Sequence, residues 1–207
     1  MPNFLRESMA REGHEATFRE ALIGVHERMT RGIPHLMEVL LYREHFTARR
    51  FLSIVRYDDE RAVQSDERRQ MLDALTAIET AHCEAPAESR PLELLYEYAT
   101  IPQQGQHGVV ALLTASSQGT AIEVGRRMAG GAGALVDRLK PTRLIVARVL
   151  DRLRLLVMLD ATDAIDIDRY LASSMRRRHM DAVAPYLAAP PQWYALDPVF
   201  RYFRRSG

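Results

Sequence analysis

The chain repeats one spacing of helix-breaking residues. Gly13 precedes a one-sided apolar helical pattern that Pro34 ends, and Gly119 precedes a second such pattern that Pro141 ends. The two intervals are 21 and 22 residues long. Because a proline cannot continue the hydrogen-bond ladder of a helix, each interval predicts one helix of similar length. The repeated spacing therefore predicts two copies of one folding unit.

Apolar runs on either side of these intervals predict the other elements. In the first copy we expect strands over 3–12, 36–45, 51–58 and 91–100, and helices over 14–29 and 60–81. In the second copy we expect strands over 109–117, 142–150, 153–160 and 193–203, and helices over 120–139 and 164–188. Both copies have the order strand, helix, strand, strand, helix, strand, which is the ferredoxin-like order.

The predicted fold class is α+β, with two tandem ferredoxin-like (βαββαβ) repeats. The repeats are expected over 1–102 and 108–207, with a short linker over 103–107. The central strands are apolar on both faces, as in sheets that are covered on both sides. Two such sheets packed face to face would form an intramolecular α+β barrel.

Composition argues against several kinds of function. The net charge of +1 gives no attraction to nucleic acid or an anionic membrane. Cys83 is the only cysteine, so neither an internal disulfide nor a thiolate metal cluster can form. No apolar run approaches the roughly 20 residues of a membrane helix, and the N-terminus lacks the apolar core of a signal peptide. We expect a cytoplasmic protein with no nucleic-acid, membrane or metal partner.

Residues 51–62, FLSIVRYDDERA, join an aliphatic strand to an aromatic and two acidic residues. This stretch resembles the third strand and following turn of the antibiotic-biosynthesis monooxygenase superfamily. Gly13 with Phe18 resembles the entry to the family's first helix, and IPHLMEVLLYRE resembles its second strand. In outline the resemblance covers the chain twice. It implies a monooxygenase of antibiotic biosynthesis that acts on a polycyclic aromatic polyketide of the anthrone or hydroquinone type, with O2 as the second substrate.

The superfamily also bears on cofactors. Its tandem members include angucycline ring-opening oxygenases that use reduced flavin, whereas other members oxidise anthrones with no cofactor. The duplicated chain is similar to the former, which implies reduced flavin (FADH2 or FMNH2) and oxidative carbon–carbon cleavage. The heme-degrading branch uses Asn, Trp and His where this chain aligns Arg6, Tyr57 and Glu67, which argues against heme degradation. We also expect a homodimer.

The candidate catalytic residues are Tyr57, Arg56, Arg43 and His35. Tyr57 takes the place of the superfamily's strand-end Trp, and Leu159 matches it in the second copy. We therefore expect the first copy to hold the working pocket. The arginines would stabilise an enolate or aryl-oxide, and His35 would accept a proton.

The candidate substrate-binding residues are the aromatic side chains Tyr42, Tyr96, Tyr98 and Trp193. Tyrosines are also favoured on strands by packing alone, and His35 precedes a strand, where turn residues occur. A polyketide cyclase on the same fold and a non-catalytic ligand-binding protein therefore remain alternative functions. The run AGGAGA at 129–134 lies in a helical pattern and lacks the GK[ST] of a phosphate loop. Its glycines are expected to kink that helix or to let another group approach closely.

Overall fold

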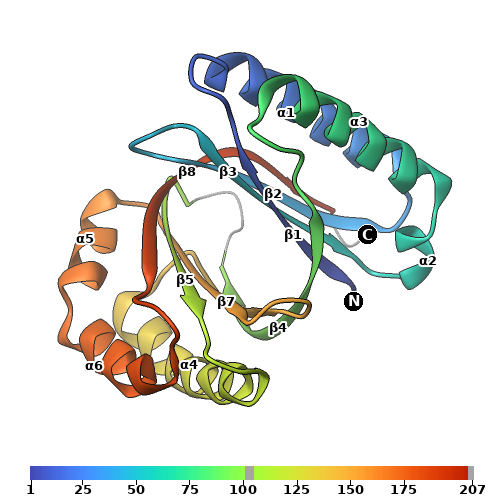
Figure 1. Cartoon of the computed structure of the whole chain (residues 1–207). Helices are drawn as coiled ribbons and strands as arrows, with labels where there is room; N and C mark the ends of the chain where they lie inside the picture. The colour runs from blue at the N-terminus through green and yellow to red at the C-terminus, as the bar shows by residue number, and fades with distance from the viewer. Residues whose placement is uncertain (101–104, 205–207) are drawn as a thin grey trace. The chain divides into compact units, whose positions relative to one another are not determined.

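The computed structural model describes residues 1–100 and 105–204, and the chain divides into two compact units (Figure 1). The first unit comprises Met1–Pro91 and the residues from Pro198 onward, and the second comprises Leu92–Asp197. Strands β4 (Ser89–Ala99) and β8 (Gln192–Phe203) contribute residues to both units. The second unit is therefore one continuous stretch of sequence, whereas the first combines the N-terminal part of the chain with the end of β8.

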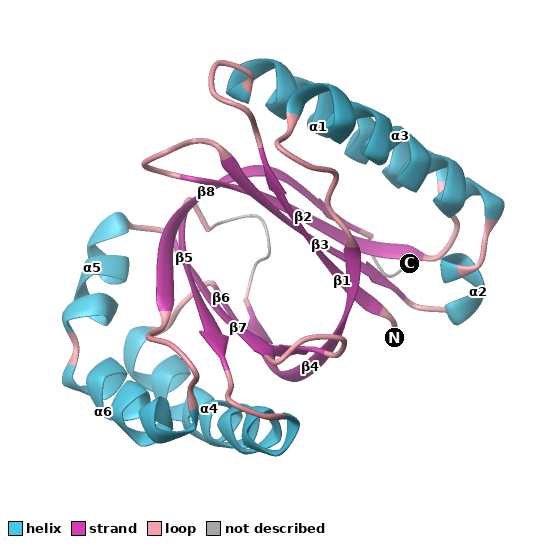
Figure 2. Cartoon of the chain, in the orientation of Figure 1, coloured by secondary structure: helices cyan, strands magenta, loops and turns pink. Residues whose placement is uncertain are grey.

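An antiparallel sheet with helices on one face makes up the first unit. Its remaining elements are β1 (Asn3–Met9), α1 (Glu15–Gly32), β2 (Leu36–Glu44), β3 (Arg50–Tyr57), α2 (Glu60–Val63) and α3 (Asp66–His82). The strand order is β1-β3-β2-β8. Figure 2 shows α1 and α3 lying along one face of this sheet. The register places Leu5 of β1 and Leu40 of β2 on either side of Ile54 of β3.

The helical spacing of the sequence becomes the core of this unit. Phe18, Leu22, Val25 and Met29 are all buried on α1. The Phe18 ring meets the Phe51 ring of β3 edge-on, with 5.1 Å between the ring centroids. Fully burying each such side chain contributes about 1.5–3 kcal/mol. The apolar stripe therefore fixes which side of α1 packs on the sheet.

The second unit has the same layers. Its remaining elements are β5 (His107–Thr114), α4 (Gln118–Leu139), β6 (Arg143–Val149), β7 (Arg154–Ala161), α5 (Ala164–Ala172), α6 (Ser174–Val183) and a 3₁₀ turn over Ala184–Tyr186. The strand order is β8-β5-β7-β6-β4, and the helices cover one face of the sheet (Figure 2). Ser117 and Thr120 form a capping box that starts α4.

The observed order of strands and helices agrees with the predicted one, and the α+β class is confirmed. Each unit's second predicted helix is divided in two, because Ser65 and Ser173 cap a new helix in mid-segment. Of the predicted linker, 103 and 104 lie outside the described residues. The repeat boundaries and the face-to-face packing stay predictions. None of the helices in the described ranges is long and apolar enough to cross a membrane.

Candidate functional site

Tyr57 and Arg56 lie on opposite faces of β3, because consecutive residues of a strand alternate. Tyr57 belongs to the core beneath the helices and is only 2% exposed. Its ring meets Phe4 edge-on, and the Arg68 guanidinium carbon lies 5.7 Å from its centroid. Burial raises the pKa of Tyr57, and the charge and hydrogen bond of Arg68 oppose that rise. Tyr57 is therefore a neutral, packed phenol.

Arg56 points away from the helices and pairs with Glu38 at 3.1 Å. Tyr42 lies on this same face of the sheet, with the Arg201 guanidinium carbon 5.4 Å from its ring centroid. Arg43 is opposite Phe51 in the register, so it lies on the helix side. The structure thus does not bring the predicted arginines to one point.

His35 lies in the turn before β2 and has a positive φ of 61°. Its imidazole Nδ1 is 3.0 Å from the Asp58 carboxylate, and half of its side-chain surface is exposed. The Asp58 backbone N–H donates to the His35 carbonyl at 3.1 Å. The pair joins the start of β2 to the end of β3, next to Tyr57 along the chain.

Tyr96, Tyr98 and Trp193 belong to the second unit, where all three pack on its core cluster. The Trp193 ring lies 6.3 Å from Tyr170, and the Arg176 guanidinium carbon lies 5.2 Å from the indole. Trp193 therefore packs against the helices of this unit, and Tyr96 and Tyr98 pack on its core.

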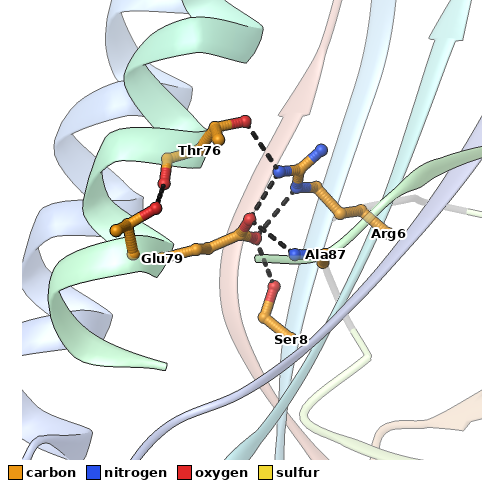
Figure 3. Close-up of polar contacts among 6 residues, drawn as sticks. Arg6, Ser8, Thr76, Glu79 and Ala87 are labelled. Carbon is orange, nitrogen blue, oxygen red and sulfur yellow. Dashed lines mark hydrogen bonds and ion pairs between the residues drawn. The ribbon is translucent and has the colours of Figure 1, made fainter. Parts of the chain in front are cut away.

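A buried ion pair between β1 and α3 was not predicted (Figure 3). Glu79 is fully buried, and its carboxylate accepts hydrogen bonds from the Arg6 guanidinium, from Ser8 Oγ at 2.6 Å and from the Ala87 backbone N–H at 2.9 Å. Thr76 Oγ1 lies 3.5 Å from Arg6. One signal in the sequence marks this site: Glu79 falls four residues after the buried Leu75, on the apolar face of its helix.

A cavity of about 410 Å³ opens in the second unit between α4, β4 and β6. Its lining residues are Glu93, Leu95, Ile122, Gly125, Arg126, Ala129 and Arg148. The four from α4 recur at i, i+3, i+4 and i+7, which places them on one helix face. The floor of the cavity is apolar, and its polar groups are two arginines and one glutamate.

The charged groups of this cavity are arranged in pairs. Arg148 donates from Nε and Nη2 to Glu93, at 2.9 and 2.7 Å. Arg126 donates to Glu123, with 2.8 Å between Nη2 and Oε1. The hydrogen bonds from Arg126 and Arg127 lower the pKa of Glu123 to about 2. A flat apolar ligand with an anionic oxygen fits this combination of floor and guanidinium groups.

The glycines of 129–134 lie within α4, as predicted. A Cβ at Gly131 would lie 2.6 Å from the His179 imidazole of α6, so this glycine permits a close approach between two helices. The approaching group is therefore a side chain of the protein itself. Ala129, two residues before Gly131 in the same helix, lines the cavity. Within residues 1–100 and 105–204, no three His, Cys, Asp or Glu side chains form a group that could hold a metal ion.

No protein-family model and no curated protein matches the sequence. Solved structures do match over nearly the whole chain. An anthrone oxidase-like protein superposes with a TM-score of 0.75 at 9% identity, covering 98% of this chain and 92% of that one. A proposed monooxygenase from Fusobacterium nucleatum subsp. nucleatum gives a TM-score of 0.76 at 7% identity, covering 98% and 94%. The chain shares its fold with these proteins.

A third neighbour is a heme-binding protein from Thermus thermophilus, with a TM-score of 0.56 at 10% identity, covering 95% of this chain and 90% of that one. The residues that align with the motif of the heme-degrading branch, Arg6, Tyr57 and Glu67, give no support to a heme site in this chain. Arg6 is bonded to the buried Glu79, and Glu67 is exposed on α3. At these identities the likeness shows the fold alone.

Proposed function

We propose that the chain is a monooxygenase that oxidises a planar phenolic substrate of the anthrone or hydroquinone type in the cavity of the second unit. One observation supports this most directly: an apolar floor and the guanidinium groups of Arg126 and Arg148 line the same cavity. The floor suits the face of a fused ring, and an arginine suits an aryl-oxide. The names of the structural neighbours support the same reaction class.

Deprotonation of the substrate is the first step of the proposed reaction. Glu93 accepts the proton, and Arg148, which is bonded to Glu93, stabilises the enolate or aryl-oxide that forms. The electron-rich anion then reduces O2. For an anthrone, the methylene carbon loses two C–H bonds and gains a C=O bond to one atom of O2. The second oxygen atom leaves as water with the two hydrogens, so no other reductant is needed.

A more specific proposal is that the substrate is an antibiotic polyketide. The protein would then cleave a carbon–carbon bond of this substrate oxidatively, with reduced flavin. The cavity volume of about 410 Å³ lies at the lower end of the range for small-molecule sites, about 300–1,000 Å³. A fused system of two or three rings fits this volume. In this form of the reaction, reduced FMN or FAD would be a further substrate that supplies electrons to O2.

Oxygen consumption tests the proposal. Purified protein is mixed with 1,8-dihydroxyanthrone in an oxygen electrode, with and without reduced FMN, against protein-free controls. We expect protein-dependent oxygen uptake without flavin, with the anthraquinone as product. Uptake only with flavin, above its own reoxidation, would support the ring-opening form. No uptake in either case would favour the cyclase or the ligand-binding alternative.

A further inference from the structure

We infer that the contact between Leu95 of β4 and Gly125 of α4 sets the depth of the cavity, and with it the number of fused rings that the site accepts. Both residues line the cavity. The inference rests on the proposed function, because it assumes that the cavity holds a flat aromatic ligand. It assigns ring-size specificity to one contact between two elements.

Leu95 occupies an irregular position in its strand. In the pairing of β4 with β6, Leu94 is opposite Ala147 and Tyr96 is opposite Val146, so Leu95 is the extra residue of a β-bulge. A bulge breaks the alternation of side chains and re-aims the extra residue. Leu95 points at α4, and it reaches Gly125 for this reason.

Gly125 provides the space into which Leu95 fits. A Cβ on Gly125 would lie 2.5 Å from Leu95 Cδ1 and 3.3 Å from Leu155 Cδ2. The first distance is shorter than two non-bonded carbon atoms can approach. Leu155 is fully buried in the core, so its side chain has no free space into which it could move. A side chain at position 125 would therefore push Leu95 outward into the cavity. Conversely, truncation of Leu95 would open the cavity down to the helix backbone.

Helix α4 supplies a matched control. Gly130 lies in the same helix, and a Cβ there meets nothing within 4 Å. Gly130→Ala adds the same methyl group and the same helix preference as Gly125→Ala, without touching Leu95. Any effect common to both variants then comes from the helix, and any difference comes from the Leu95 contact.

Isothermal titration calorimetry tests the inference with 1-naphthol and 1,8-dihydroxyanthrone as two-ring and three-ring probes. The proteins are the wild type, Leu95→Ala, Gly125→Ala and Gly130→Ala, each checked for folding by circular dichroism. A ring that gains or loses two buried CH groups changes its affinity by about tenfold. We expect Leu95→Ala to improve three-ring over two-ring binding by about that factor, Gly125→Ala to worsen it similarly, and Gly130→Ala to leave it unchanged.

The results separate this inference from the proposed function. Binding of both probes with the same affinity ratio in all four proteins would overturn the inference alone, even if oxygen uptake is observed. Shifted ratios without oxygen uptake by any protein would support the inference and overturn the oxygenase proposal. Failure of every protein to bind either probe would overturn both. If Gly125→Ala does not fold, the Leu95→Ala ratio decides.

Discussion

At the level of single residues, one ion pair of the first unit is almost fully buried. Glu79 is fully buried, and its carboxylate forms an ion pair with the Arg6 guanidinium, of which little is exposed. Glu79→Gln would leave that guanidinium in the interior without a counter-charge. We expect the free energy of unfolding to fall by about 3–5 kcal/mol, the usual cost of breaking a buried pair on one side. Urea denaturation measures this loss.

The control for this variant is Glu67→Gln, on the exposed side of the same helix. It should change stability by less than about 0.5 kcal/mol. The double variant Arg6→Met, Glu79→Met should recover part of the loss, because it removes both charges. A Glu79→Gln protein as stable as the wild type would show that the pair is not buried as described.

We expect His26 to make the free energy of unfolding depend on pH. It is fully buried on α1, and burial lowers its pKa to about 4 from an ordinary 6.5. Between these values the unfolded chain binds a proton that the folded chain does not, so stability falls as pH falls from 6.5 to 4. The loss from this residue is on the order of 3 kcal/mol. His26→Leu should abolish that part of the pH dependence, whereas His45→Gln at an exposed site should keep it.

Elements in the second unit meet through small residues, and α4 shows this best. Gly130→Ala should stabilise the protein by about 0.5–1 kcal/mol, because alanine is the better helix former. Gly131→Ala should fail to give this gain, since its Cβ would strike the His179 ring of α6. Thermal unfolding of the two variants compares neighbouring positions in one helix. Equal gains would mean that His179 moves aside freely.

Element positions could be predicted because burial leaves a periodic pattern, as in Phe18, Leu22, Val25 and Met29. The cavity could not be predicted in the same way. Its lining comes from three elements that are distant in sequence, and Leu95 takes part only because a bulge interrupts strand alternation. For Tyr57 the sequence motif is interpreted as the wall of a ligand pocket. The structure shows that the same motif also marks a strand end packed beneath α2 and α3.

At the scale of the whole molecule, the two compact units begin and end at other residues than the predicted repeats, whose boundaries stay a prediction. The first unit includes the chain from Pro198 onward, and the second begins within β4 at Leu92. A fragment of residues 1–102 would therefore lack the end of β8, and its sheet would lose the strand beside β2. We expect this fragment and the fragment 108–207 to be unfolded alone and folded when co-expressed. Circular dichroism and co-purification test this, and two independently folded fragments would contradict it.

We propose that oxidation takes place in the second unit, beside Arg148. Both units carry an arginine paired with a glutamate on a strand, Arg148 with Glu93 and Arg56 with Glu38. The most direct measurement is the rate of oxygen uptake with 1,8-dihydroxyanthrone for Arg148→Leu and Arg56→Leu, both folded. Loss of the group that stabilises the anion should slow Arg148→Leu by about 100-fold, with Arg56→Leu close to the wild type. A slow Arg56→Leu protein together with a fully active Arg148→Leu protein would contradict this placement and would locate the reaction in the first unit.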